Sequence, residues 1–337
     1  MIAIDCDSRG LQLGRFFCRP DFIVGPDGPR VLEVNFGPSN GSLALVDTVQ
    51  TRFAHTDQGR SLAAQGVVLR LPRSMQTLGL GLTQVLRRAA AGTGNNHLVV
   101  AVATNEEADR PKGHISDFCN GLTALGFRVT LAKLSDIDTR GIGAQVGPDR
   151  VDAVYCMCTF AEMRRADVPE KLLRDLVTLD RAAAVDFIGG PAHLLFDNKA
   201  NLALVHDSIV DPCFDPARLA FVRKHITPTC LALNHGHLSG AVIYKPVDDF
   251  GGFGITFDPR TLAETGSRYI AQEIVRNACL WVDEKGLWTR HLCFGPSFVG
   301  GLHASTLLRA KSADLDVPII NAAQGAAVGP VLIHEKV

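Results

Sequence analysis

The stretch Tyr244–Ile255, with the sequence Y-K-P-V-D-D-F-G-G-F-G-I, decides the interpretation of this chain. An apolar run over 240–244 leads into it and predicts a short strand, because glycine and proline bound the run. Lys245 ends that strand, two aspartates follow, and three glycines lie within 251–254. Closely spaced glycines let a backbone approach an anion without Cβ clashes, and a lysine adds positive charge. The stretch therefore predicts a phosphate-binding loop, with an ordinary tight turn as the alternative. It is not a Walker A loop, in which the lysine follows the glycines.

Composition places the chain among globular proteins and removes several classes of partner. Of its 337 residues, 46% are apolar and 20% are charged, and the formal net charge is −1. These values exclude a disordered chain and give no general attraction to nucleic acid or to an anionic membrane. Apolar runs stay below the roughly 20 residues of a transmembrane helix, and no signal peptide is visible. We expect two or three domains in a cytoplasmic protein.

The nine cysteines are scattered along the chain, and only Cys156 and Cys158 lie close together. Zinc sites favour a second cysteine pair at similar spacing, which this sequence lacks. Cys156 and Cys158 are two residues apart within Val154–Cys158, a spacing that is typical of one face of a strand. We therefore interpret these cysteines as buried thiols in a reducing compartment.

Residues 19–35 predict a β-hairpin. Phe22–Val24 and Val31–Asn35 form its strands, and a turn rich in glycine and proline joins them. On the return strand Glu33 and Asn35 are two residues apart, so they project from the same face. Two oxygen ligands side by side on a rigid strand suit Mg²⁺. An ordinary polar strand face is the alternative.

Strands and helices alternate between residues 97 and 195. His97–Ala103 is continuously apolar, as in a strand that is buried on both faces of a parallel sheet. Two further strands and two helices are predicted at Phe127–Leu131, Asp152–Cys156, Ile115–Leu125 and Pro169–Asp180. This order predicts a small doubly wound α/β domain. It lacks a dinucleotide fingerprint, because its glycine pair precedes the first strand instead of following it.

Taken in order, these segments resemble the ATP-grasp ligases, and in particular the circularly permuted branch to which eukaryotic-type glutathione synthetase belongs. In that branch the metal-binding E-x-N strand precedes the glycine-rich loop, as it does here. The branch pattern R-x-D-[FY]…E-I-N is matched by Arg19, Asp21, Phe22, Glu33 and Asn35. The match is collinear through nearly the whole chain. The resemblance implies an α/β fold in which residues 1–96 and 196–337 form a permuted ATP-grasp domain. A small parallel-sheet substrate domain, residues 97–195, would be inserted into it.

The resemblance also implies two cofactors, ATP and Mg²⁺, and a set of residues for each. Glu33, Asn35 and Asp249 would be the metal ligands, and the choice between Asp248 and Asp249 stays open. The residues implied to contact ATP are Lys199, Lys245, Gly251, Gly252, Gln272, Glu273, Ile274, Val275, Glu284 and Lys311. Arg309, Lys311 and Arg19 would be the catalytic cations, with Arg309 holding the acid substrate. Gly325–Ala327 would belong to a small-residue lid loop.

The sequence departs from the family where the family binds its peptide substrate. The arginine and tyrosine of the family's V-Y-F-R-D-G-Y segment fall on Met157 and Phe160. A loop serine after E-x-N falls on Asn40, and an N-terminal segment of the family has no counterpart. A methionine cannot pair with a substrate carboxylate, and an unpaired buried charge is costly. We therefore expect a rebuilt pocket of Arg19, Asn40, Met157, Phe160 and Arg309. It would accept an apolar or aromatic amino acid, or a neutral amine.

The resulting prediction is an ATP-dependent carboxylate–amine or peptide ligase. It would form ADP through an acyl-phosphate intermediate, with a pocket unlike that of glutathione synthesis. Its partners would be small-molecule acid and amine substrates, without nucleic acid or membrane, and a homodimer stays open. The alternative is a nucleotide-binding module of the same fold that does not catalyse. That alternative draws on Asp249 and Phe250, which stand where the family carries a glutamate and a glycine.

Overall fold

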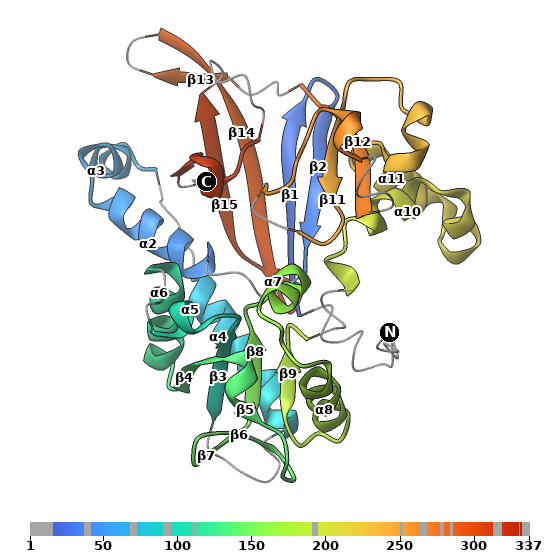
Figure 1. Ribbon diagram of the computed structural model, residues 1–337. Helices are drawn as coiled ribbons and strands as arrows, with labels where there is room; N and C mark the ends of the chain where they lie inside the picture. Colours follow the sequence, from blue (N-terminus) through green and yellow to red (C-terminus); the bar gives the residue numbers. More distant parts are fainter. Residues whose placement is uncertain are drawn as a thin grey trace.

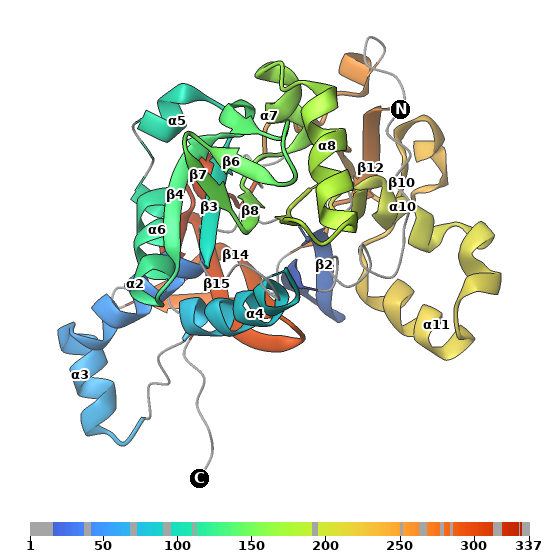
Figure 2. The ribbon, with the colours of Figure 1, turned by 90° about the horizontal axis from the view of Figure 1, so that it is seen from below.

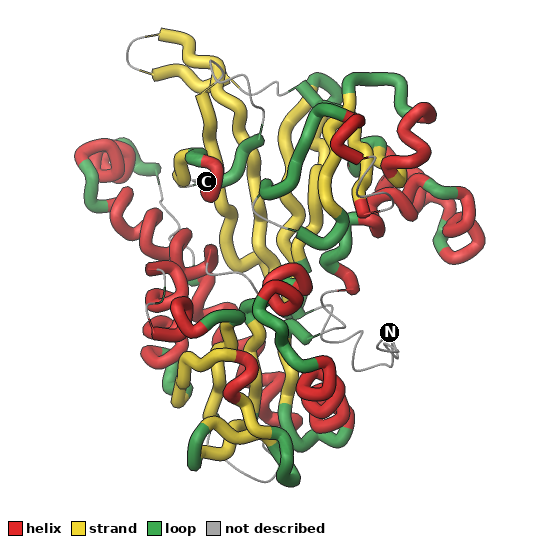
Figure 3. The backbone as a smooth tube through the Cα atoms, in the orientation of Figure 1, coloured by secondary structure: helices red, strands yellow, loops and turns green. Residues whose placement is uncertain are grey.

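The protein has a mixed α/β fold with several sheets, seen in a computed structural model (Figures 1 and 3). The structure describes residues 16–36, 42–67, 73–89, 96–109, 111, 113–190, 195–249, 252–262, 268–276, 280–283, 286–312, 319–329 and 331. Long strands fill the upper part of Figure 3, whereas shorter strands alternate with helices in the lower part.

The largest sheet is antiparallel and six-stranded, with the order β16-β15-β14-β1-β2 and with β13 paired to β14. Its strands are β1 (Phe17–Gly25), β2 (Gly28–Asn35), β13 (Leu280–Asp283), β14 (Gly286–Val299), β15 (Leu302–Ser312) and β16 (Ala327–Gly329). The predicted hairpin over 19–35 is confirmed, because β1 and β2 pair antiparallel with Asp21 opposite Glu33. The pairing puts these two carboxylates on the same face of the sheet.

A second antiparallel sheet has the order β10-β12-β11 and lies beside β2 in Figure 1. It comprises β10 (Thr229–Leu231), β11 (Val242–Pro246) and β12 (Tyr269–Glu273). Helices α10 (Ala200–His206) and α11 (Pro216–His225) accompany it, with the 3₁₀ turns η2 (Ser208–Cys213), η3 (Ala232–His237) and η4 (Pro259–Leu262). Leu202 of α10 packs with Ile270 of β12 and with Val34 of β2. This apolar cluster fixes the second sheet against the first.

The segment between residues 97 and 195 forms a four-stranded parallel sheet with the order β4-β3-β8-β9. Its strands are β3 (His97–Val102), β4 (Arg128–Lys133), β8 (Ala153–Cys156) and β9 (Asp186–Ile188). The accompanying elements are α5 (Asn105–Asp109), α6 (Gly113–Ala124), α7 (Phe160–Arg165), α8 (Glu170–Arg181), η1 (Leu134–Asp136) and the small sheet β5 (Ile137–Asp138), β6 (Ala144–Val146) and β7 (Asp149–Val151). The predicted strand over 97–103 is confirmed, because every residue of β3 is buried.

Both faces of this parallel sheet are covered, as the side chains of β3 show. Val100 packs in a core with Phe118 of α6, whereas Val99 packs in another core with Leu176 of α8. Figure 2 shows α6 and α8 on opposite sides of these strands. Cys156 and Cys158 are buried free thiols in the α8 core, as expected. Gly126 ends the α6 turn at φ +90°, a conformation that glycine adopts without strain.

Three helices connect the large antiparallel sheet to the parallel sheet: α2 (Ser42–Ala54), α3 (Asp57–Ala64) and α4 (Ser74–Ala89). The carboxylate of Asp47 on α2 accepts hydrogen bonds from the Ser74 and Met75 amides, and so fixes the start of α4. One core cluster unites Leu43 of α2 and Leu82 of α4 with residues of both sheets. Among the helices that the structure describes, none combines the length and hydropathy needed to cross a bilayer.

Candidate functional site

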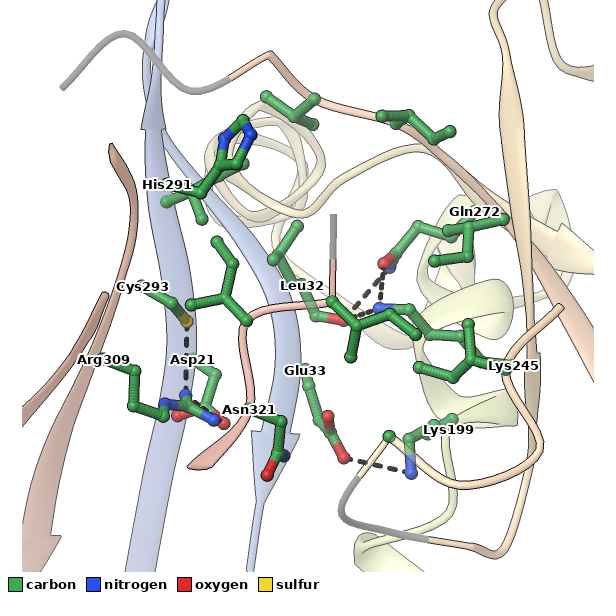
Figure 4. Close-up of a pocket in the computed structure, with 18 of the residues that line it drawn as sticks. Asp21, Leu32, Glu33, Lys199, Lys245, Gln272, His291, Cys293, Arg309 and Asn321 are labelled. Atoms are coloured by element: carbon green, nitrogen blue, oxygen red, sulfur yellow. Dashed lines mark hydrogen bonds and ion pairs between the residues drawn. The ribbon is translucent and has the colours of Figure 1, made fainter. Parts of the chain in front are cut away.

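A cavity of about 400 Å³ lies between the two antiparallel sheets (Figure 4). Apolar side chains supply part of its wall: Ile23, Leu32, Ile243, Ile255, Ile274, Val275, Ile319 and Ile320. Charged and amide side chains supply another part: Asp21, Glu33, Lys199, Lys245, Asp249, Gln272, Glu273, Arg276, Arg309 and Asn321. The cavity can therefore hold a ligand with one apolar and one anionic end.

Lys245 and Gln272 form the buried polar wall of the cavity. Lys245 is only 8% exposed, and its Nζ donates to Gln272 Oε1 at 2.6 Å. Gln272 Nε2 in turn donates to the Leu32 carbonyl at 3.1 Å and to Thr229 Oγ1 at 3.0 Å. Burial lowers the pKa of Lys245, although Glu33 opposes that shift. An ammonium held mainly by neutral acceptors keeps the capacity to pair with an anionic ligand.

Lys199 lies immediately before α10, where its amide donates to the Val247 carbonyl. Its Nζ pairs with Glu33 Oε1 at 3.0 Å and also donates to the main-chain carbonyl of Asp249. Burial alone would lower the pKa of Lys199, but Glu33, Asp197 and Asp249 together raise it. Lys199 thus stays protonated beside a carboxylate and joins β2 to the loop that follows β11.

A second ionic cluster is centred on Asp21. Arg309 Nη2 lies 2.8 Å from Asp21 Oδ2, and Arg19 Nε lies 3.0 Å from Asp21 Oδ1. Asn35 Nδ2 donates to Asp21 Oδ2 at 3.1 Å, and Arg309 Nη2 also contacts Cys293 Sγ at 3.2 Å. Burial would raise the pKa of Asp21, but the two guanidinium groups lower it below its usual value. Two arginines on one aspartate leave one formal positive charge in the cluster.

Of the three residues expected to bind Mg²⁺, two lie at the cavity and one does not. Glu33 and Asp249 both line the cavity. Asn35 does not line it, and its amide nitrogen donates a hydrogen bond to Asp21. Within the described parts of the chain, no cluster of three His, Cys, Asp or Glu side chains could hold a metal ion. Mg²⁺ commonly takes one or two carboxylates together with substrate phosphates. The donors present therefore fit a metal that arrives with a nucleotide, and Asp248, which does not line the cavity, is the weaker candidate.

Further predicted residues divide into those at the cavity and those away from it. Gly252 and Glu273–Val275 line the cavity, whereas Lys311 does not and donates to the Ile319 carbonyl at 3.3 Å. Arg19 does not line the cavity, but it pairs with Asp21, which does. The predictions for Asn40, Gly251 and Glu284 lie outside the described residues, and so does the side chain of Phe160.

Met157 does not line the cavity and packs instead against the core shared by Phe118 and Tyr155. A different hollow of about 490 Å³ opens near the carboxyl ends of β3 and β8. Its wall consists of Ala103, Thr104, Glu106, Glu107, Glu162, Arg165 and Ala166. This end of the parallel sheet is thus more charged than the apolar pocket that Met157 and Phe160 led us to expect.

Sequence reasoning assigned no role at the cavity to Asp21, His291, Cys293 or Asn321, although all four line it. For Asp21 a signal existed, because Arg19 and Asp21 alternate on a strand whose other positions are largely apolar. For residues 319–329, called the lid loop below, the sequence predicted only that small residues lie close to a ligand. The lid loop packs on the glycine-rich loop, since a Cβ at Gly252 would lie 2.9 Å from Ile319 Cγ2.

Comparison with known proteins identifies similar folds among solved structures. No protein-family model matches the chain, and no curated protein matches it. A glutathione synthetase-like effector from Globodera pallida, in its apo form, superposes with a TM-score of 0.60 at 12% identity, over 94% of this chain and 76% of that one. A Methylobacillus flagellatus KT protein with the provisional name gamma-glutamylcysteine synthetase gives 0.53 at 9% identity, over 94% and 80%. The chain therefore has a glutathione synthetase-like fold.

Proposed function

We propose that this protein is an ATP-dependent carboxylate–amine ligase of the circularly permuted ATP-grasp type. The observation that carries the proposal is the cavity itself, in which Lys199, Lys245 and Glu33 face one another beside an apolar wall. Two buried ammonium groups suit a chain of phosphates, and the apolar wall beside Ile274 and Val275 suits a nucleotide base. We keep residues 97–195 as the substrate domain, set between residues 1–96 and 196–337 of the ATP-grasp domain.

In the proposed reaction, a substrate carboxylate oxygen attacks the γ-phosphorus of ATP and ADP leaves. The amine nitrogen then attacks the acyl carbon, and phosphate and a proton are released. Glu33 and Asp249 would hold Mg²⁺, which would neutralise phosphate charge when bound. Lys199 and Lys245 would hold the phosphates in position, since this chemistry depends mainly on orientation and electrostatic stabilisation.

The Asp21 cluster would orient the acid that becomes phosphorylated. Arg309 and Arg19 share one aspartate, so the cluster keeps one positive charge with which a substrate carboxylate can pair. Asp21 holds both guanidinium groups in fixed orientations, which limits the reorganisation needed when the acid binds. The proposed pocket for acid and amine still comprises Arg19, Asn40, Met157, Phe160 and Arg309.

A nucleotide-binding module without catalysis is the second candidate. The observation in its favour is that internal partners already engage the expected metal ligands. Asn35 bonds to Asp21, and Asp249 lies 3.7 Å from Arg165. The name of the Globodera pallida structure, an effector, also describes a synthetase-like fold in a different role for that protein.

The deciding experiment measures ADP release against a panel of acid and amine pairs, with ATP binding followed by calorimetry. A ligase releases ADP faster when a matching amine is added, because the amine consumes the acyl phosphate. Saturable ATP binding without ADP release under any pair would favour the module. A wide preference for γ-glutamylcysteine with glycine would contradict the rebuilt pocket.

A further inference from the structure

Helix α7 brings two arginines from the parallel-sheet region to the loop beside the cavity. The helix starts after Cys158 and is fixed by a capping box between Thr159 and Glu162. This start places Arg164 and Arg165 in its last turn. Figure 1 shows α7 at the junction between the parallel sheet and the antiparallel sheets.

Both arginines face the loop that follows β11. Arg164 Nη2 lies 2.7 Å from Asp248 Oδ2, and Arg165 Nη1 lies 3.7 Å from Asp249 Oδ2. The two arginine side chains are similarly exposed, at 58% and 60%. Their partners differ, because Asp249 lines the cavity and Asp248 does not. Arg165 therefore pairs with a candidate metal ligand, whereas Arg164 pairs with an aspartate outside the cavity.

Asp249 is held from two directions. Its main-chain carbonyl accepts from Lys199, which fixes the backbone, while its carboxylate is drawn toward Arg165. At 3.7 Å the Arg165 contact is longer than a hydrogen bond, and its partly exposed ions are screened by water. A contact of this kind orients a carboxylate and can be given up at little cost.

Arg165 also has other anions within its surroundings once it leaves Asp249. It lines the hollow at the end of β3 and β8 together with Glu107 and Glu162. A guanidinium that turns away from Asp249 therefore remains near other carboxylates and in partial contact with water.

We propose that Arg165 is a positioning residue that holds the Asp249 carboxylate toward α7 and releases it when a magnesium-bound nucleotide fills the cavity. After the release, the Arg164–Asp248 pair would still join α7 to the loop that follows β11. This inference rests on the proposed function, because it needs a nucleotide and a metal at the cavity.

The test compares the wild type with Arg165→Gln and with the matched control Arg164→Gln. Binding of a non-hydrolysable ATP analogue is measured by calorimetry over a series of Mg²⁺ concentrations and in EDTA. In Arg165→Gln the Mg²⁺ concentration for half-maximal binding should fall about two- to fivefold, as expected for the loss of one exposed competing ion pair. Affinity in EDTA should not rise, and Arg164→Gln should keep the wild-type requirement.

A third variant, Arg165→Lys, keeps the charge and should restore most of the wild-type Mg²⁺ requirement. An unchanged requirement in Arg165→Gln, or an equal shift in Arg164→Gln, would overturn the inference. Absence of analogue binding by the wild type would instead overturn the proposed function. Circular dichroism controls the fold of each variant, and both arginines are exposed enough that folding should be preserved.

Discussion

Two charged clusters line one cavity, and they are built in different ways (Figure 4). In the first, the side chains of Asp21 and Arg309 are each only 6% exposed, and Arg19 and Asn35 complete the shell. In the second, Lys199 is 9% exposed but its partner Glu33 is 26% exposed. The first cluster is largely buried and held by several internal contacts, although Asp21 and Arg309 also line the cavity, whereas the carboxylate of the second is more exposed.

The difference in exposure between the two clusters has different consequences for stability and for ligand binding. Ions removed from water need permanent partners, and Asp21 receives them from Arg309, Arg19 and Asn35. An open ion pair loses less by exchange, so Lys199 and Glu33 can turn to a ligand and its metal. We therefore expect the loss of Asp21 to affect mainly stability and changes in the second cluster to affect mainly binding.

The largest effect is expected from Asp21→Ala. Its removal leaves Arg309 and Arg19 without their shared carboxylate, and breaking a buried pair costs about 3–5 kcal/mol. The free energy of unfolding, measured by urea denaturation, should fall by that amount. The matched variant Glu33→Ala should lose less, because its side chain is 26% exposed and Lys199 keeps the main-chain carbonyl of Asp249 as an acceptor. Equal losses in the two variants would remove the distinction between the clusters.

Glu33→Gln should come next and should act on turnover instead of stability. The variant keeps the size of the side chain but removes one charge that would hold the metal, so ligation should fall about 100- to 1,000-fold. Its free energy of unfolding should fall by less than that of Asp21→Ala, because the introduced amide oxygen can still accept from Lys199. Near-normal turnover would contradict the assignment of Glu33 as a metal ligand.

The two lysines sharpen the comparison, because both should bind ATP but only one stabilises the protein. Lys199→Ala and Lys245→Met should each weaken ATP binding by about 1.5–3 kcal/mol, which calorimetry measures. Lys199→Ala should also destabilise the fold, since Glu33 loses its partner. Lys245→Met should leave stability unchanged or raise it, because burial already disfavours the charged form of Lys245. Unchanged ATP affinity in both variants would show that neither lysine faces the phosphates.

The smallest effects should appear at the extremes of pH, and they should have opposite signs. The folded pKa of Asp21 is lowered, so its stabilisation is present above about pH 3.9 and is lost as pH falls through the folded pKa. The folded pKa of Lys199 is raised, so its stabilisation is present below about pH 10.4 and is lost as pH rises through the folded pKa.

Unfolding free energies measured against pH test both statements. Asp21→Asn should flatten only the acid limb of the profile, and Lys199→Met should flatten only the alkaline limb. A change on the wrong limb in either variant would show that another group controls that part of the profile.

Much of the fold was predictable because local periodicity determines it. The apolar run at 97–103 became the fully buried β3, and the alternation around Glu33 put that carboxylate on the cavity face. Lys245 was also found, since it ends a short strand before the glycine-rich loop, whereas Gln272 was found only through the family resemblance. The predictions for β3, Glu33 and Lys245 needed only the neighbours of each residue in the sequence.

The contacts between distant segments were not predictable from one sequence. Arg309 was assigned to a substrate acid, but its nearest carboxylate is Asp21, from the first strand of the structure. Met157 was assigned to a pocket, yet it shares a face with Tyr155 and packs in the core. In both cases the sequence identified the residue type, but which elements pack against it depends on the tertiary arrangement.

Gly252 has a consequence for the rates at which the cavity fills and empties. Its backbone adopts φ +78°, and Ile319 of the lid loop packs where a side chain would otherwise stand. We expect a ligand to exchange while these two loops are apart, so that loop opening, and not the strength of the lysine contacts, limits residence time. A methyl group at position 252 would hold the loops apart, which shortens residence and admits water to any acyl phosphate before the amine can reach it.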